Sequence, residues 1–157
     1  MEEIGRIVAK IEACADRHGL DRKLLYAICQ TESGLNPYAI RFESSYRWFY
    51  KVSELARTNR ITDSTENALQ SFSYGPAQVM GAVMREYGYA GPLHVIPMSW
   101  EIALEYGAMH LQKMTKRYIL MNDAIASYNA GSVRKTMDGE YVNAEYVKKV
   151  RTFYDMS

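Results

Sequence analysis

Cysteine, proline and net charge are all scarce in this 157-residue sequence, which has two Cys, four Pro and a formal net charge of +1. Two thiols are too few for a small fold held together by disulfides. Cys14 and Cys29 both lie at apolar positions of helical patterns, which predicts buried free thiols. A nearly neutral chain gives no electrostatic reason to expect binding to nucleic acid or anionic lipid, so we expect no nucleic-acid partner.

Hydrophobic runs of membrane-spanning length are also absent. No window approaches the roughly 18 apolar residues of a transmembrane helix. Met1–Ile4 lacks the basic start and apolar run of a secretory signal. The histidines His18, His94 and His110 are not spaced as metal ligands, and no glycine-rich phosphate loop or nucleophile elbow occurs. The sequence thus predicts a soluble protein without membrane insertion, metal or cofactor, and it disfavours nucleotide-binding and serine-hydrolase functions.

Helical periodicity runs along most of the chain and predicts a mainly α protein of about seven helices with little or no strand. Gly19 should end the first helix, and Asp21 should cap the second. Pro76 suits the first position of a helix that continues to about Tyr87, and Gly88–Pro97 has the two glycines and two prolines of a loop. No linker or repeat divides the chain, so residues 1–157 should form one domain. Other helices are expected over residues 2–18, 62–69, 99–118 and 122–130, before Asn36 and after Asn143.

Four polar stretches stand at the ends of these helices. They are Glu-Ser-Gly-Leu-Asn-Pro at 32–37, Ser-Tyr-Gly-Pro-Ala-Gln-Val-Met at 73–80, Ala-Ser-Tyr-Asn-Ala-Gly at 126–131 and Asn-Ala-Glu-Tyr-Val-Lys-Lys-Val at 143–150. In order and spacing they resemble the motifs of the soluble lytic transglycosylases (glycoside hydrolase family 23), whose catalytic domain has a lysozyme-like helical fold. The resemblance extends from about Leu24 to Val150, and four stacked motifs are more specific than any one alone.

The resemblance implies roles for individual side chains. Glu32 matches the single catalytic acid/base. The residue types alone also permit structural roles: a carboxylate satisfied by a nearby cation for Glu32, helix capping for the amides, and core packing for the tyrosines. The residues that the resemblance implies to contact or enclose the substrate are Ser33, Gln78, Met80, Tyr128, Asn129 and Tyr146.

The implied reaction cleaves the MurNAc–GlcNAc β-1,4 bond of peptidoglycan glycan strands without water. Glu32 would protonate the leaving oxygen and then accept the proton of the muramic acid C6 hydroxyl, which attacks C1 to give a 1,6-anhydro sugar. A carboxyl group donates a proton near neutral pH only when its pKa is raised, and partial burial raises it. Glu32 follows Ile28 by four residues and so projects from the apolar face of its helix, which predicts such burial.

The stretch between Asn36 and Tyr74 is longer than in typical family members, and we interpret residues 39–71 as an inserted segment. It contains Glu43, a candidate second carboxylate that could position a water in a hydrolytic muramidase similar to goose-type lysozyme. Alternatively, Glu43 pairs with Arg41 or Arg47 and orders the segment. The segment also contains the aromatic residues Tyr46, Trp48, Phe49 and Tyr50. They fit two interpretations: they form a lid or sugar platform, or they form a small core of the segment itself.

Gly75-Pro76-Ala77-Gln78 stands where the family more often has Gly-Leu-Met-Gln, so the shape of the sugar groove should differ. Three functions stay open: a lytic transglycosylase, a hydrolytic muramidase and a peptidoglycan-binding module without turnover. A monomer that acts on the cell wall is expected. The missing secretion signal and the compact single domain suggest a phage-encoded enzyme, delivered at entry or released at lysis, or an accessory of a bacterial secretion system.

Overall fold

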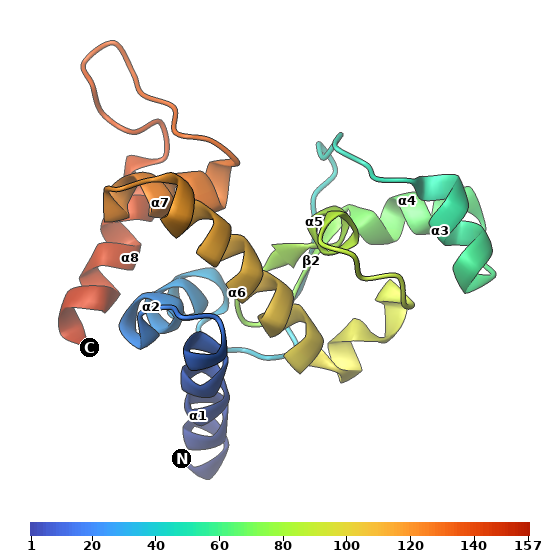
Figure 1. Ribbon diagram of the computed structural model, residues 1–157, viewed down its shortest axis with the longest axis horizontal. Coiled ribbons are helices and arrows are strands. Elements are labelled where there is room, and N and C mark those ends of the chain that lie inside the picture. The colour runs from blue at the N-terminus through green and yellow to red at the C-terminus, as the bar shows by residue number, and fades with distance from the viewer.

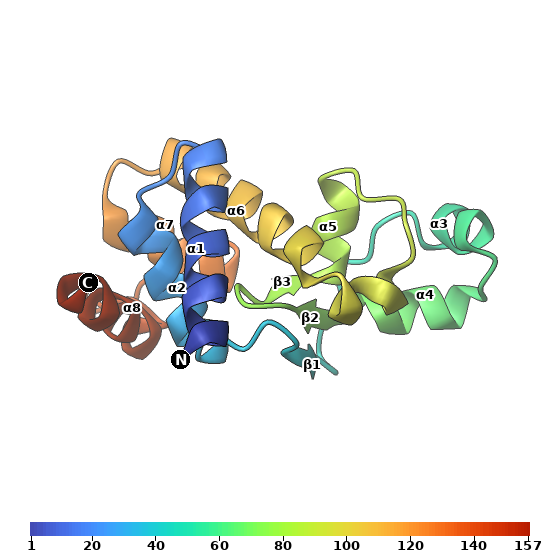
Figure 2. The same ribbon diagram turned by 90° about the horizontal axis from the view of Figure 1, so that it is seen from below.

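The computed structural model describes all 157 residues and shows two lobes joined by one long helix (Figure 1). The helix α6 (Trp100–Arg117) runs through both lobes, as Figure 2 shows. No helix is both long enough and apolar enough to cross a membrane. What we call the helical lobe contains α1 (Glu2–Arg17), α2 (Arg22–Ser33), α7 (Met121–Ala130) and α8 (Ala144–Met156). What we call the sheet lobe contains β1 (Ile40–Phe42), α3 (Val52–Asn59), α4 (Asp63–Gln70), β2 (Phe72–Tyr74), β3 (Val79–Met80), α5 (Gly81–Glu86) and the 3₁₀-helix η1 (Leu93–Met98).

The helical lobe is built around a cluster of 23 buried residues. Helix α2 packs against both α1 and α8, and α6 packs against α1 and α7. Leu25 and Ile28 of α2 are completely buried, and each such side chain contributes about 1.5–3 kcal/mol to stability. The carboxylate of Asp21 accepts a hydrogen bond from the backbone N–H of Lys23 at 2.8 Å, which confirms the predicted cap. Gly34, with φ +63°, ends α2 just beyond Glu32. The core therefore fixes the helix end that carries Glu32.

Both cysteines belong to this core as buried free thiols, as predicted. Burial raises the pKa of Cys14 to about 12 and raises the pKa of Cys29 well above its ordinary value. Because the thiolate is the nucleophilic form of cysteine, neither side chain is suited to nucleophilic catalysis near neutral pH.

The sheet lobe contains a three-stranded antiparallel sheet in the order β1-β2-β3. Ile40 pairs with Tyr74 across β1 and β2, and Tyr74 pairs with Val79 across β2 and β3. A second buried cluster packs the sheet against α5, η1 and α6, and it consists of Tyr74, Val79, Met84, Leu93, Ile96 and Ala103. Because Ala103 comes from α6, the same helix supports both lobes.

A completely buried ion pair joins α4 to α5 inside the sheet lobe. Nε and Nη2 of Arg85 donate to the two carboxylate oxygens of Glu66 at 2.7 and 2.9 Å, and neither side chain is exposed. Nη1 of Arg85 donates to the carbonyl oxygens of Tyr89 and Gly91 at 2.9 and 2.6 Å. Gln70 adds a hydrogen bond to Glu66 at 2.9 Å. A buried charge pair is tolerated when its remaining hydrogen-bonding capacity is satisfied in this way.

The predicted mainly α fold class is confirmed, but the predicted helix at Pro76 is wrong at its start. Helix α5 begins at Gly81. Residues 75–78 form a turn instead, and Val79–Met80 pair with β2. The small sheet is not evident in the sequence, because strands of two or three residues are too short for an alternating pattern to show.

Two further helices lie where the sequence predicts none, so the helices number nine. The predicted loop Gly88–Pro97 overlaps η1, which runs from Leu93 to Met98. Helix α3 gives a weak pattern because it buries only Leu55 and Ala56 and has no side-chain cap at Lys51. The predicted short helix at 62–69 is present as α4, with the hydroxyl of Thr62 accepting from the backbone N–H of Thr65 at 3.2 Å.

Candidate active site

A cleft of about 590 Å³ lies between the two lobes. Its walls come from the ends of α2 and α7, from β1, β2, β3, α5 and α6, from the turn at residues 75–78, and from the connections that follow β1 and α7. In Figure 1 these two connections project toward the same side of the molecule. Six of the eight candidate residues line the cleft, namely Glu32, Glu43, Gln78, Met80, Tyr128 and Asn129. The other two, Ser33 and Tyr146, are not among the lining residues: Ser33 donates to the carbonyl oxygen of Pro76, and Tyr146 donates to Glu32.

Glu32 is a half-buried carboxyl group at the C-terminal end of α2. Burial raises its pKa from the ordinary value of 4.5 to about 7. The hydrogen bond from Tyr146 and the charges of Arg41 and Lys149 oppose this rise, whereas the charge of Glu43 adds to it. A carboxyl group with a pKa near 7 can both release and accept a proton near neutral pH, which is the property that general acid/base catalysis needs.

Tyr146 of α8 donates its hydroxyl hydrogen to Oε1 of Glu32 at 2.7 Å. Burial, followed by the charge of Glu32, raises the pKa of this phenol well above its ordinary value, so it stays protonated and acts as a donor. The contact fixes the orientation of the carboxyl group. The sequence places Tyr146 at the active site, and the structure places it beside the carboxyl and outside the lining of the cleft.

Tyr128 of α7 lines the cleft with its ring while its hydroxyl is committed to the protein. The hydroxyl donates to the carbonyl oxygen of Ala77 at 2.6 Å. The ring of Tyr128 also packs against the imidazole of His110 of α6, and the two ring centroids lie 5.0 Å apart. The sequence does not single out His110, yet this residue lines the cleft. A hydrogen bond of 3.0 Å joins its Nδ1 to the hydroxyl of Tyr87. Burial lowers the pKa of His110 to about 4, so this imidazole is neutral at neutral pH.

The turn at residues 75–78 is held in place by side chains on both sides. Ser33 donates to the carbonyl oxygen of Pro76 at 2.8 Å. Gln78 has a left-handed backbone (φ +49°), and its amide nitrogen donates to the carbonyl oxygens of Ala39 and Gly75 at 3.1 and 2.9 Å. Its amide oxygen accepts from the hydroxyl of Ser73 at 2.8 Å. Gln78 therefore shapes the wall of the cleft, and Ser33 fixes the turn to which Gln78 belongs.

The turn at residues 75–78 packs closely against α6 at Gly107. A Cβ atom added to Gly107 would lie 2.8 Å from the Cβ of Ala77 and 3.4 Å from the hydroxyl oxygen of Tyr128. The absence of a side chain at Gly107 thus allows the turn and the tyrosine to approach α6.

Asn129 is exposed at the rim of the cleft, next to Tyr128. Its side-chain oxygen accepts a hydrogen bond from Nδ2 of Asn143 at 2.9 Å, and the same Nδ2 donates to the carbonyl oxygen of Ala126 at 3.0 Å. These contacts tie the end of α7 to the start of α8, so the third and fourth sequence motifs meet at the rim.

Glu43 combines features of both roles considered from the sequence. It lines the same cleft as Glu32. It also forms an ion pair with Arg41, whose Nε lies 3.0 Å from Oε1 of Glu43, and not with Arg47. The backbone N–H of Glu43 donates to the carbonyl oxygen of Ser71 at 2.9 Å, which fixes the start of the connection. Two carboxylates therefore share the cleft, and one of them has a cationic partner.

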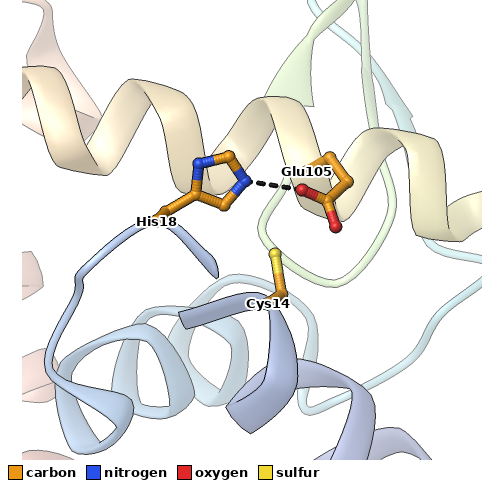
Figure 3. A group of neighbouring side chains, drawn as sticks. All are labelled: Cys14, His18 and Glu105. Atoms are coloured by element: carbon orange, nitrogen blue, oxygen red, sulfur yellow. Dashed lines mark hydrogen bonds and ion pairs between the residues drawn. The ribbon is translucent and has the colours of Figure 1, made fainter. Parts of the chain in front are cut away.

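A group of three potential metal ligands lies outside the cleft, between α1 and α6 (Figure 3). The ligand atoms of Cys14, His18 and Glu105 lie within 4.8 Å of one another, with His18 Nε2 at 2.5 Å from Glu105 Oε2. Arg17 binds the other carboxylate oxygen. Burial alone would raise the pKa of Glu105, but the hydrogen bonds from His18 and Arg17 lower it. Because the protein itself supplies partners to this carboxylate, we interpret the group as a contact that holds α1 on α6.

A mainly helical fold with a small antiparallel sheet and a cleft between two lobes is the architecture of the lysozyme-like superfamily. The chain matches the family model of the transglycosylase SLT domain over residues 10–150, and it therefore belongs to this family of peptidoglycan lytic transglycosylases. The match includes all four motifs, and it implies a peptidoglycan substrate and action on the cell wall. No curated protein and no solved structure matches the chain significantly.

Proposed function

We propose that this protein cleaves the MurNAc–GlcNAc β-1,4 bond of peptidoglycan by lytic transglycosylation, with Glu32 as the single acid/base. It does so as one monomeric domain, residues 1–157, in which residues 39–71 are an insertion. The observation that carries this proposal is the position of Glu32 in the interlobe cleft, with its pKa raised to about 7 by burial and its carboxyl group oriented by Tyr146.

The reaction uses the two protonation states of Glu32 in turn. The carboxylic acid first donates its proton to the glycosidic oxygen, and the bond between this oxygen and C1 of MurNAc breaks. The C6 hydroxyl oxygen of the same MurNAc then forms a bond to C1 and transfers its proton to the carboxylate of Glu32. The acid is regenerated, no water is consumed, and the products are a 1,6-anhydroMurNAc end and a free GlcNAc 4-hydroxyl.

The other candidate residues shape the place where the sugar lies. Met80, Tyr128 and Asn129 line the same cleft as Glu32, and we propose that they contact the glycan. Gln78 contributes mainly through the shape of its turn, because the protein already uses both polar atoms of its side chain. Ser33 and Tyr146 are positioning residues, since they act through Pro76 and Glu32.

Analysis of the reaction products tests this function directly. We expect mass spectrometry of digested peptidoglycan to show muropeptides with 1,6-anhydroMurNAc ends. Reducing MurNAc ends, which are heavier by one water, would show hydrolysis instead. A digest without new ends would mean that the chain is a binding module.

One observation favours hydrolysis as a second candidate: Glu43 lines the cleft together with Glu32. If Glu43 positioned a water, Glu43→Gln would lower activity at least roughly 100-fold. Because Glu43 is already paired with Arg41, we expect this variant to retain most of the wild-type rate and to form the same anhydro ends. Initial rates and product masses of the variant and the wild type decide between the two.

The pH dependence of kcat/KM should report the ionisation of Glu32 in the free enzyme. Because the acid form starts the reaction, we expect kcat/KM to fall about tenfold per pH unit above about pH 7. Tyr146→Phe removes a hydrogen bond that lowers the pKa, so the falling limb should move to higher pH. Glu43→Gln removes a negative charge that raises the pKa, so the limb should move to lower pH. Profiles that shift in the same direction in both variants would contradict the assignment of this limb to Glu32.

A further inference from the structure

Trp48 is a large aromatic side chain that stays 75% exposed although it lines the cleft. The other tryptophan, Trp100, is only 8% exposed and belongs to the core. An indole ring left in solvent forgoes the stabilisation that burial would give. Single exposed hydrophobic residues are common on protein surfaces, but this one stands at the rim of the cleft that holds Glu32.

The neighbouring aromatic residues do not form a core with Trp48. Tyr46 and Phe49 pack edge to face with their ring centroids 5.9 Å apart. Tyr46 also lines the cleft, and burial raises its pKa to about 12. The packing of Tyr46 and Phe49 fits the interpretation as a small core of the segment, and the exposure of Trp48 fits the interpretation as a sugar platform. Tyr46 and Phe49 pack together, whereas Trp48 remains available to a ligand.

The connection that carries Trp48 is anchored at both ends. The backbone N–H of Glu43 donates to the carbonyl oxygen of Ser71 at 2.9 Å. At the other end, Gln70 accepts from the backbone N–H of Tyr50 and donates to its carbonyl oxygen, both at 2.8 Å. Gln70 is itself bound to Glu66 of the buried ion pair. The ring is thus presented on a fixed support, which reduces the entropy lost when a ligand binds.

We propose that Trp48 is a stacking platform for a pyranose ring of the glycan strand at an outer subsite of the cleft. The inference rests on the proposed function, because it takes the ligand to be a β-1,4-linked N-acetyl sugar polymer. In such sugars the equatorial substituents leave the ring faces to C–H groups. A flat aromatic side chain can cover this apolar face while the hydroxyl and acetamido groups remain solvated.

Binding measurements with a defined oligosaccharide test the platform separately from catalysis. The probes are the hexamer and the dimer of β-1,4-linked N-acetylglucosamine, measured by calorimetry on full-length protein in a Glu32→Gln background that prevents turnover. We expect Trp48→Ala to weaken hexamer binding about tenfold. Dimer binding should change much less, because the dimer fills fewer subsites than the hexamer and can bind at subsites other than the platform. Trp48→Phe should restore most of the affinity, and Met98→Ala, which removes an exposed apolar side chain outside the cleft, should bind like the parent protein.

Fluorescence gives a readout that a merely structural role would not change. Because Trp100 is buried, acrylamide should quench mainly Trp48 in the free protein. Hexamer should shift the emission to shorter wavelength and protect it from quenching, and Trp48→Phe should abolish both effects. Equal hexamer affinity in Trp48→Ala, or unprotected Trp48 in the complex, would overturn the platform. If the platform were overturned but the protein with Glu32 intact still formed anhydro ends, the proposed function would stand without the platform. If the protein with Trp48 intact neither bound the hexamer nor, with Glu32 intact, cleaved peptidoglycan, the proposed function and the platform would both be wrong.

Discussion

Glu32→Gln is expected to reduce the rate of peptidoglycan cleavage at least roughly 1,000-fold, because the amide can neither donate nor accept the transferred proton. The side chains have the same shape, and the glutamine oxygen can still accept the hydrogen bond from Tyr146. The loss should therefore appear in kcat while the far-ultraviolet circular dichroism spectrum stays that of the wild type. A variant that kept a tenth of the wild-type rate would rule out Glu32 as the acid/base.

The same substitution should make the protein more stable at alkaline pH. Because burial raises the pKa of Glu32 from 4.5 to about 7, the folded state holds this proton more tightly than the unfolded state does. The stability that this protonation contributes is fully present below about pH 4.5 and is lost as the pH rises through about 7. The wild type should lose on the order of 3 kcal/mol from this group by pH 8. Urea unfolding of both proteins should therefore favour Glu32→Gln at pH 8 and show little difference at pH 4.5.

Glu66→Ala is expected to lower the free energy of unfolding by about 3–5 kcal/mol, because it leaves the charge of Arg85 buried without a counter-charge. Replacing both residues, as Glu66→Leu with Arg85→Met, should cost less than the sum of the single replacements, since no unpaired charge remains. Urea unfolding followed by circular dichroism measures the stability of the wild type, the two single variants and the double variant, which together form a double-mutant cycle.

The exposed pair of Arg151 and Asp155 on α8 provides a matched control. Its side chains are 38% and 63% exposed and lie 3.7 Å apart, so Asp155→Ala should change stability by less than about 0.5 kcal/mol. If Glu66→Ala were as mild as this control, the buried pair would not hold α4 on α5.

Glu66→Ala should also weaken hexamer binding, because Gln70 connects Glu66 to the segment that carries Trp48.

Features that depend on local sequence could be predicted well. Asp21 caps α2 because its carboxylate reaches an N–H two residues away, and the burial of Glu32 follows from its position on the apolar face of that helix. The four motifs could be recognised because each is a contiguous stretch. Their order along the chain was sufficient to predict the fold class and the carboxyl group of the cleft.

Features that depend on distant partners could not be predicted. The amide of Gln78 is bound to Ala39, far away in the sequence, so its structural use has no local signal. Tyr146 and Glu32 are 114 positions apart, and only the fold decides that they meet directly. Pro76 suits a turn as well as a helix start, and long-range hydrogen bonds stabilise the turn, from Ser33 to Pro76 and from Gln78 to Ala39. His110 was missed because a single histidine has no ligand spacing to recognise, and only the fold brings it, half-buried, to the cleft.

The way in which the 75–78 turn is anchored bears on how its sequence can evolve. The carbonyl oxygens of Gly75, Pro76 and Ala77 accept hydrogen bonds from Gln78, Ser33 and Tyr128, respectively. Every amino acid has a carbonyl oxygen, so the identities at the two central positions can drift from Leu-Met to Pro-Ala without loss of the anchors. Divergent members of the family should therefore be recognised more reliably by the three anchoring side chains than by the letters between them.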